Sequence, residues 1–313
     1  MSYPAESPGA GVFSSPPPGG EWVVAGRPSG VELRRRFLGW PRLLWKRRDL
    51  VAASVRRDLE ARFRGTLLGF AWVLALPLLQ FAIYAFVFTQ LLGVRLGASA
   101  PAGAMGVYMF TGTLVWSALA DALSRSTTCL VDHRHLLQKL PYPAQLLPVQ
   151  IGLSSLVTLL AGIAAFAAFC AASGVWSAPG RQLLVWAPLL LLLQLALTTG
   201  LGLLFAALHL RLRDTQPFVG VALTVGMFVT PIFWVPSEEV LPGVGEWRWL
   251  VELNPAHHLV YAWRELLMSG GPELVFDGSF ARSLGIVGAA ATVTLCAGSW
   301  AFFRVERHLA DEL

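Results

Sequence analysis

Six stretches of this chain contain no Asp, Glu, Lys or Arg, and their spacing constrains the fold more than any other feature. They cover residues 65–94, 96–120, 144–180, 182–210, 215–237 and 283–303. A helix rises about 1.5 Å per residue, so about 20 apolar residues cross a hydrocarbon layer of about 30 Å. Each stretch is long enough, and the sequence therefore predicts six membrane spans.

The composition favours helices over a β-barrel as the spanning structure. The chain is 55% hydrophobic and 14% charged, and its apolar runs are continuous rather than alternating. A barrel needs segments of about 10 residues with alternating polarity. We therefore expect an all-α membrane protein, with spans at about 67–92, 105–122, 145–173, 182–208, 216–235 and 283–303.

The distribution of Lys and Arg predicts the orientation of the spans. With a cytoplasmic N-terminus, 19 of these residues lie inside and 5 lie outside: Arg95, Arg181, Arg248, Arg264 and Arg282. This asymmetry obeys the positive-inside rule. We expect a multi-pass protein of the plasma membrane with both termini in the cytoplasm, and we assign the net charge of +5 to this orientation rather than to nucleic-acid binding.

Three segments outside the spans have distinct character. Residues 1–46 are rich in Pro, Gly and Ser and predict a disordered cytoplasmic tail. Residues 47–64 carry Val51, Val55 and Leu59 at helical spacing among arginines, which predicts an amphipathic helix in the membrane interface. Residues 236–281 form a long outer segment whose apolar and aromatic content predicts helices that dip into the outer leaflet.

Residues that could carry catalysis are sparse. Asp121 is expected at the inner end of the second span, and His257 and His258 lie in the outer segment without the spacing of a metal site. A P-loop needs Gly-Lys-Ser/Thr, but the two lysines follow Trp45 and Gln138. We expect no catalytic residue, no metal and no cofactor in this chain. A membrane-embedded enzyme that modifies glycans or lipids remains the alternative, and it would need clustered acids or histidines at one membrane face.

Aromatic side chains in the spans have two interpretations. They sit in the interfacial belts of the membrane, or they line a passage in which sugar rings slide. The candidates for such a lining are Trp72, Phe81, Tyr84, Phe88, Tyr108, Trp116, Phe233 and Trp234.

An ordered set of motifs resembles the permeases of type-2 ABC exporters in the polysaccharide (O-antigen and teichoic acid) class. The motifs are RRDLEARFRGTLLGFAWVLALPLLQ (56–80), LLQKLPYPAQLLPV (136–149), RLRDTQPFV (211–219), TPIFWVP (230–236) and LNPAHHLVYAWRELLMSG (253–270). The resemblance implies that residues 65–313 form an ABC-2 type transmembrane domain with 47–64 as interface helix and re-entrant helices between spans 5 and 6.

The resemblance also implies partners and cargo. It implies a homodimer in the inner membrane that binds two copies of an ABC ATPase subunit, on which ATP and Mg²⁺ are bound. The expected cargo is a lipid-linked polysaccharide such as O-antigen, and the alternative cargo is a drug or another hydrophobic molecule. The surface expected to couple to the ATPase comprises Arg134, His135, Lys139, Pro141, Pro143, Arg211, Arg213 and Asp214.

Two further sets of residues follow from this interpretation. Arginines of the interface helix are expected to attract the lipid diphosphate and anionic headgroups: Arg47, Arg48, Arg56 and Arg57. Backbone positions where a gate could flex are Gly65, Gly69, Pro77 and Pro231, with Gly65 and Gly69 also expected to permit close helix approach.

Overall fold

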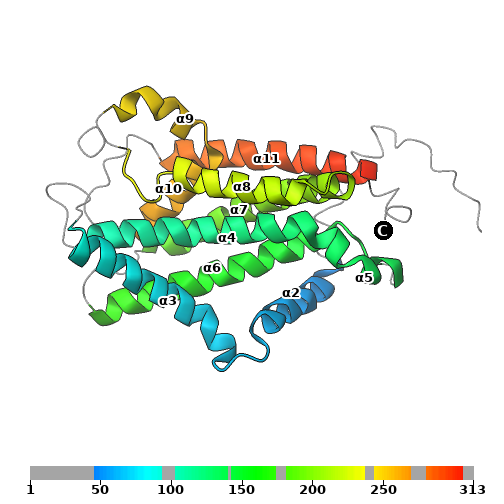
Figure 1. The fold of residues 1–313 in the computed structure, drawn as a ribbon, viewed down its shortest axis with the longest axis horizontal. Helices are drawn as coiled ribbons and strands as arrows, with labels where there is room; N and C mark the ends of the chain where they lie inside the picture. Colours follow the sequence, from blue (N-terminus) through cyan, green and yellow to red (C-terminus); the bar gives the residue numbers. More distant parts are fainter. Residues whose placement is uncertain are drawn as a thin grey trace, which may run out of the picture.

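Long helices lie side by side along the longest axis of the molecule (Figure 1). The computed structural model describes residues 46–93, 103–139, 142–173, 181–236, 243–268 and 280–305, and within these ranges the regular structure is entirely helical. The long helices are α4 (Ala104–Asp132), α6 (Leu146–Ser173), α7 (Arg181–Arg211), α8 (Thr215–Val229) and α11 (Phe280–Val305). The predicted tail lies outside the described residues except for Lys46.

The bundle has two distinct ends. Short helix α5 (Arg134–Lys139), the α7–α8 turn and the last turn of α11 lie at one end, which we call the α5 end. Helices α9 (Arg248–Glu252) and α10 (Pro255–Leu267) lie toward the other, the α10 end. Segments predicted to be cytoplasmic thus share one end, and the predicted outer segment lies at the opposite one.

Three helices are long and apolar enough to cross a membrane: Leu146–Ala172, Gln182–Arg211 and Phe280–Val305. They coincide with the predicted third, fourth and sixth spans. Shorter apolar helices, Trp72–Phe88 and Thr215–Val229, occupy the predicted first and fifth spans.

Helix α4 is the centre of the bundle. It contacts α3 (Trp72–Tyr84), α6, α7, α8 and α10, and most of its side chains are buried. Its polar residues are accommodated locally, because Thr111 and Thr113 donate hydrogen bonds to the carbonyls of Val107 and Met109. A helix enclosed by protein needs less hydrophobicity than one that faces lipid, which explains why α4 is the least obvious span in the sequence.

The predicted loop 123–143 is wrong over its first half. Helix α4 continues to Asp132, and only then do α5 and the Pro143 region follow. Arg125, which lies in this stretch, pairs with Asp58 of α2 and with Asp121 of its own helix.

The prediction that Gly65 and Gly69 permit close helix packing is also wrong. Both have positive φ, 79° and 49°, and a Cβ atom placed on either would meet nothing within 4 Å. They form the bend between α2 (Arg48–Phe63) and the short 3-10 helix Gly69–Ala71. Glycine is needed here because it adopts left-handed backbone conformations without a steric penalty.

Close helix packing occurs instead between α7 and α11. A Cβ atom on Gly298 would lie 2.0 Å from the carbonyl oxygen of Gly200, and one on Gly200 would lie 2.4 Å from the backbone nitrogen of Leu295. The two backbones are therefore in direct contact, which is the packing that small residues allow in membrane helices. This pair forms the most extensive helix contact of the bundle.

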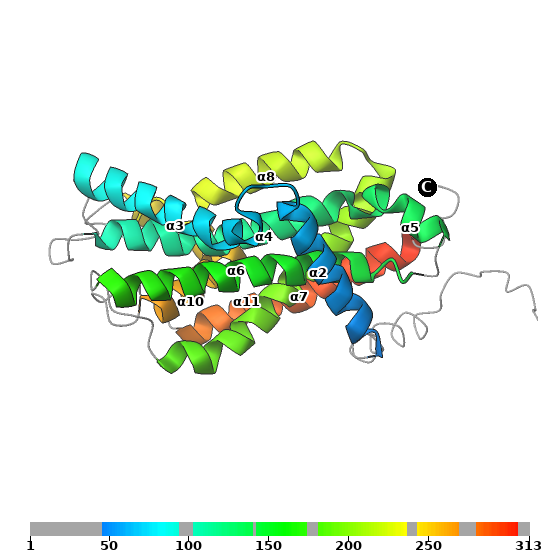
Figure 2. The same ribbon diagram turned by 90° about the horizontal axis from the view of Figure 1, so that it is seen from below.

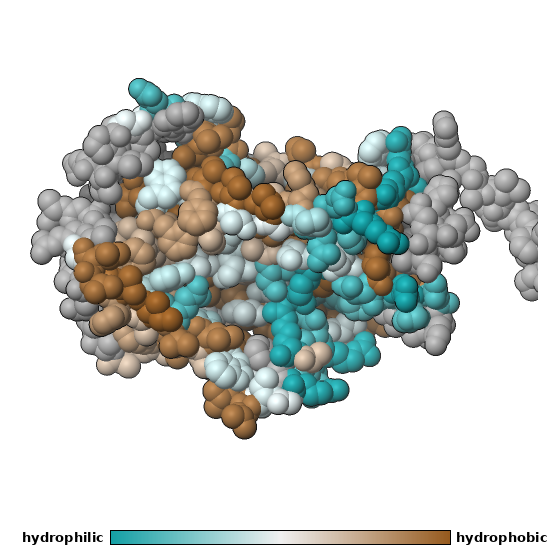
Figure 3. Space-filling view, viewed as in Figure 1, coloured by the Kyte–Doolittle hydropathy of each residue, from teal (hydrophilic) through white to brown (hydrophobic). Residues whose placement is uncertain are grey.

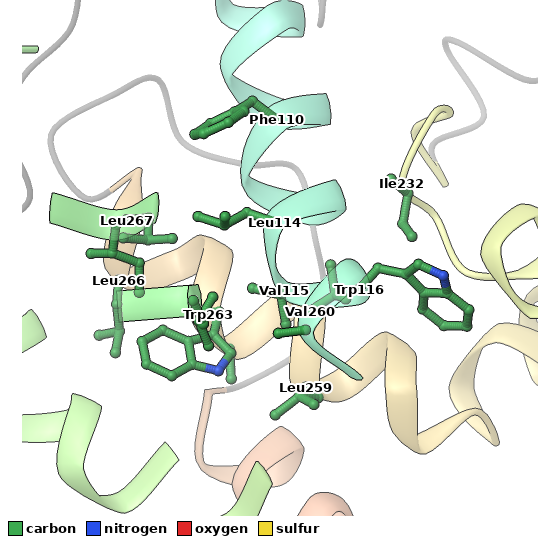
Figure 4. Packing of buried hydrophobic residues seen from close by; sticks show 14 of the residues in the cluster. Phe110, Leu114, Val115, Trp116, Ile232, Leu259, Val260, Trp263, Leu266 and Leu267 are labelled. Atoms are coloured by element: carbon green, nitrogen blue, oxygen red, sulfur yellow. The ribbon is translucent and has the colours of Figure 1, made fainter. Parts of the chain in front are cut away.

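The outer segment contains helices, as predicted, but protein surrounds most of α10. Helix α10 follows the 3-10 helix Val244–Trp247 and α9 along the chain. Asn254 caps α10 by accepting a hydrogen bond from the Ala256 backbone N–H at 3.0 Å. Helix α10 packs against α4, α7 and α11. In Figure 4, Val260 and Trp263 of α10 lie toward Val115 of α4.

Substitution of Gly298 should disrupt the α7–α11 contact. We expect Gly298→Ala to lower the free energy of unfolding by about 3 kcal/mol, because the added methyl group meets rigid backbone. Thermal unfolding of the purified protein in detergent measures this effect. Gly285→Ala is the matched control on the same helix, since a Cβ there meets nothing within 4 Å. Equal stability of the two variants would contradict the backbone contact.

Candidate functional site

Two neighbouring elements present apolar stripes that the rest of the chain leaves uncovered. Exposed side chains on α3 and the π-helix η2 (Ala85–Leu91) recur at helical spacing, as do those on α8. They are Leu76, Leu79, Ile83 and Phe86 on the first element and Phe218, Val221, Val225 and Phe228 on the second. Figure 3 shows apolar surface over both elements. Exposed apolar area of this extent marks contact with lipid or with another protein.

An aromatic cluster connects α3 and η2 to the end of α8. The ring centroid of Tyr84 lies 6.3 Å from that of Phe88 and 6.2 Å from that of Phe233, and Phe228 and Phe233 are 6.1 Å apart. The Trp234 indole donates a hydrogen bond to the Phe228 carbonyl at 2.8 Å. We call these five residues the α3–α8 aromatic cluster. Four of the five side chains are partly exposed, and that of Phe228 is largely exposed.

The structure separates the predicted channel-lining residues into two groups. Tyr84, Phe88, Phe233 and Trp234 belong to the aromatic cluster, and Trp72 is partly exposed at the start of α3. Phe81, Tyr108 and Trp116 are instead buried among the helices of this chain. Phe81 packs edge-on against Phe110, Phe166 and Phe169, so its ring serves the hydrophobic core.

A network of two carboxylates and two guanidinium groups joins α2 to α4 and α6. Asp58 of α2 accepts from Arg125 of α4 at 2.9 Å, and Asp121 of α4 accepts from Arg62 of α2 at 2.7 Å. Arg125 also reaches Asp121 at 3.1 Å, and Arg62 lies 3.5 Å from Asp58. We call Asp58, Arg62, Asp121 and Arg125 the four-charge network.

Serines of α6 complete this network. Ser154 donates to Asp58, and Ser155 donates to Asp121. The four charged side chains are 23% to 34% exposed, so they are shielded from water without being sealed off. Because the charges balance, the network can lie among apolar helices at a moderate desolvation cost.

The four-charge network attaches α2 to the rest of the bundle. Val51 and Leu59 are buried, and α2 packs on α6 while it crosses the bundle obliquely (Figure 2). Its apolar stripe thus contacts protein. Sequence reasoning assigned Asp121 to a span end, although Asp58 and Arg62, like Asp121 and Arg125, are acid–base pairs four residues apart. These two acid–base pairs, together with the Ser154-Ser155 pair in an apolar span, were the sequence signal for a polar contact between α2, α4 and α6.

The arginines expected to attract lipid headgroups are exposed on α2 and at its start. Arg47, Arg48, Arg56 and Arg57 all have solvent-accessible side chains. The Arg56 guanidinium donates to Glu60 at 2.7 Å, which raises the pKa of Arg56. Arg57 donates to Ser54 at 3.1 Å. These groups are therefore accessible, and two of them already have partners on their own helix.

The expected coupling residues gather at the α5 end. Arg134 and His135 are exposed on α5, and Lys139 is its last residue. Arg211, Arg213 and Asp214 are exposed in the α7–α8 turn. Pro143 lies between α5 and α6, whereas Pro141 is outside the described residues. Figure 3 shows hydrophilic side chains gathered toward this end and over α2.

Arg264, which the charge count placed in the outer segment, lies on α10 and is buried there. Its side chain is 1% exposed and lies against α4. The apolar and aromatic pattern of 255–267 does indicate a helix, but no feature of that pattern says that protein covers its charged face.

Two histidines at the α10 end are buried in neutral form. Burial lowers the pKa of His257 to about 3, and the neighbouring His258 ring and the positive charge of Arg264 act in the same direction. The pKa of His258 is also lowered, first by burial. His258 Nε2 lies 2.8 Å from the Glu252 carbonyl oxygen and Nδ1 lies 3.0 Å from the Ser283 hydroxyl. A neutral ring that donates from Nε2 and accepts at Nδ1 satisfies both partners.

The model of a transporter family described as "ABC-2 type transporter" matches residues 49–268 of this sequence. This match spans α2, the apolar helices, the aromatic cluster and α10. The chain belongs to the ABC-2 type transporter family.

Curated relatives of this ABC-2 type transporter have related names. The chain is 25% identical over 222 residues to "O-antigen export system permease protein RfbA" of Klebsiella pneumoniae, covering 71% of this chain and 81% of that protein. It is 30% identical over 193 residues to the protein of the same name in Myxococcus xanthus, covering 62% of this chain and 71% of that one.

Family membership accounts for the distribution of polar and apolar surface. An ABC-2 permease is the membrane subunit of a transporter, and it works with an ABC ATPase subunit. The apolar helices embed this chain in a membrane. The family places this chain among transporter subunits rather than among enzymes that catalyse a reaction themselves.

Charge exchange in the four-charge network should show that it holds α2 in place. We expect Asp58→Arg to lower the free energy of unfolding by about 2 kcal/mol, because it places two guanidinium groups against each other in a partly buried site. Asp58→Arg with Arg125→Asp should recover part of this loss. Thermal unfolding of the purified permease measures both variants.

The exposed pair on the same helix is the control for that experiment. Arg56 and Glu60 are 82% and 48% exposed, so Glu60→Arg should leave the unfolding temperature nearly unchanged. A similar loss in Glu60→Arg and Asp58→Arg, with no recovery in the double variant, would contradict a stabilising network.

The buried histidines predict loss of stability in acid. The unfolded chain binds a proton at a histidine near pH 6.5, whereas folded His257 stays neutral down to about pH 3. Stability is therefore complete above pH 6.5 and falls as the pH decreases, by about 2 kcal/mol per fully buried histidine at about pH 5. Thermal unfolding at a series of pH values should show this slope.

Two variants separate the buried histidines from other acid effects. His257→Gln should reduce the pH dependence, while His135→Gln on exposed α5 should leave it unchanged. The groups around the pair are Glu252 of α9, Arg264 of α10 and Arg282 of α11, none of which changes charge between about pH 5 and pH 8 at ordinary pKa values. An unaltered slope in His257→Gln would count against this histidine.

Proposed function

We propose that this chain is the permease subunit of an ATP-driven exporter that moves a lipid-linked polysaccharide, such as O-antigen, across the inner membrane. The observation that carries the proposal is the partly exposed aromatic cluster beside uncovered apolar stripes, in a family whose relatives here are named as O-antigen export permeases. The apolar faces of sugar rings pack against aromatic rings without fixed hydrogen bonds. Such a lining binds a glycan weakly enough for it to slide.

The proposed assembly is a homodimer with two ATPase subunits, on which ATP and Mg²⁺ are bound. Each permease subunit would have six spans: α3 with η2, α4, α6, α7, α8 and α11. The α5 end would face the cytoplasm together with both termini. Support comes from the sequence, in which 19 Lys and Arg residues lie on that side of the predicted spans and 5 on the other.

The stripes on α3 and α8 would border the path of the glycan and its lipid. They are apolar enough to face a lipid chain or the second permease subunit, and the aromatic cluster lies between them. The diphosphate of the lipid carrier would be attracted at the cytoplasmic leaflet by the arginines of α2 and its start: Arg47, Arg48, Arg56 and Arg57. Basic residues near a membrane surface favour anionic headgroups.

The ATPase would contact α5 and the α7–α8 turn. Arg134, His135, Arg211, Arg213 and Asp214 are exposed there. Closure of the ATPase pair would shift the permease between two packings, since a partner changes only an equilibrium between states that it binds differently. Flexing is proposed at Pro77 within α3, at Pro231 after α8, and at the Gly65 and Gly69 bend.

Reconstitution with the partner ATPase tests the cargo. We expect ATP hydrolysis in liposomes to rise severalfold when lipid-linked glycan is added, as a transporter whose cargo favours its active state requires. Stimulation by small hydrophobic compounds, without stimulation by the glycan, would instead identify a drug exporter. ATP hydrolysis by the permease alone would contradict the proposal that a separate ATPase subunit hydrolyses ATP.

A variant pair tests the aromatic cluster directly. Phe233→Ala should reduce glycan export about tenfold, a loss typical of one stacking contact removed from a binding path. Trp300→Ala is the control, because Trp300 is 49% exposed on α11, on a different helix from the cluster. The same loss of export in both variants would contradict a specific role of the cluster.

A further inference from the structure

The chain bends sharply where α8 ends. Thr230 donates its backbone N–H to Gly226, and Pro231 follows, so the helix cannot continue. Residues 230–235 lead away from α8 and carry Phe233 and Trp234 of the aromatic cluster. Backbone carbonyls at such a helix end lack intrahelical partners and need others where water is excluded. The position of this bend therefore depends on the side chains that its carbonyls find.

Two side chains from other helices bind these carbonyls. Arg264 Nη1 of α10 donates to the Pro231 carbonyl at 3.0 Å. The Tyr108 hydroxyl of α4 lies 3.2 Å from the Pro231 carbonyl oxygen and 3.1 Å from that of Trp234. Asn254, which caps α10, donates to the Thr230 hydroxyl at 2.9 Å. The bend is thus held by α4 and α10 in addition to its own backbone, in which the Ile232 N–H donates to the Thr230 carbonyl at 2.7 Å.

Arg264 is the central group of this arrangement. Its guanidinium carbon lies 3.5 Å from the centroid of the Tyr108 ring, and Nη2 donates to the Tyr108 carbonyl at 3.1 Å. One side chain therefore binds α4, the bend and an aromatic face at once. The planar guanidinium suits this task, whereas a lysine ammonium is a point charge that cannot keep both carbonyl contacts and the stacking geometry.

Helix α4 has a space shaped for the guanidinium. A Cβ atom on Gly112 would lie 2.2 Å from Arg264 Nη2, so only glycine admits the charged group here. Among the described residues, no carboxylate lies within ion-pair distance of Arg264. The guanidinium charge is stabilised by the carbonyls of Pro231 and Tyr108 and by the Tyr108 ring. Because Pro231 belongs to the bend, the position of Arg264 and that of the bend depend on each other.

We propose that Arg264 is a positioning residue for export, which holds the 230–235 bend and thereby sets Phe233 and Trp234 where the cargo passes. The inference rests on the proposed function, because it assigns a role in transport to the aromatic cluster. Arg264 itself is buried behind the bend and does not contact the cargo.

The first arm of the test measures the bend without any transport. Phe233→Cys, in a chain whose Cys129, Cys170 and Cys296 are changed to Ala, reacts with a membrane-impermeant maleimide at a rate that reports the position of the bend. We expect Arg264→Lys and Gly112→Ala to change this rate about tenfold, the factor that corresponds to one hydrogen bond of a charged group. Gly112→Ala displaces the guanidinium while Arg264 is retained, so the two variants test the same contact independently.

The second arm measures export with the native Phe233. Arg264→Lys and Gly112→Ala should lower the maximal rate of glycan export by a similar factor and leave the KM for ATP of the partner ATPase unchanged. A purely structural defect would instead lower the amount of assembled complex. Arg282→Gln is the matched control, since Arg282 is also an arginine at the α10 end, half-exposed and 3.1 Å from Glu252.

The outcomes are distinct. Parent-like labelling in both Arg264→Lys and Gly112→Ala would overturn the proposal, and so would altered labelling with normal export or an equal effect of Arg282→Gln. If the parent protein exports small hydrophobic compounds but no glycan, the proposed function fails. The labelling arm, repeated with transport of those compounds, then still decides whether Arg264 positions the bend.

Discussion

A hydrocarbon layer supplies no partner for a charge or for a free backbone group, and this constraint underlies the whole arrangement. In the described part of the bundle, the charged side chains that lie between α2, α4 and α10 have partners in the protein. Asp58 and Asp121 meet Arg62 and Arg125, with hydroxyl groups of α6 as further donors. Arg264 lies on backbone carbonyls and a tyrosine ring. Polar groups here determine which helices can lie together, because an unmatched group would cost more than the packing contributes.

Two kinds of contact divide the molecule into a rigid part and exposed elements. Backbone contact at Gly200 and Gly298 joins α7 to α11, and α4 is enclosed by most of the other helices. Helices α3 and α8 each keep an apolar stripe uncovered beside the aromatic cluster, and α7 exposes Leu184, Val185 and Leu192 near its start. A transporter needs a frame that does not deform and surfaces that meet lipid, cargo or a partner. The proposed export path follows the elements whose stripes are free.

Prediction from sequence was most accurate where a single local property decides the outcome. Continuous apolar runs identified α6, α7 and α11, because a helix long enough to cross lipid must be apolar along its length. The helices of the outer segment also occur where the pattern indicated them. The sequence did not separate the aromatic candidates from one another. Tyr84 and Phe233 meet in a partly exposed cluster, whereas Phe81 and Trp116 are core residues, and a ring looks the same in sequence in either position.

The sequence by itself determined that this chain is helical and membrane-embedded and that it contains no P-loop motif. These properties follow from composition and spacing along the chain. Only the tertiary structure decided that α2 docks through the four-charge network, that Gly200 and Gly298 rather than Gly65 and Gly69 allow close packing, and that Arg264 is buried. Those facts depend on which residues face each other across a helix interface. Such residues are far apart in the sequence, so their spacing along the chain does not reveal the contact.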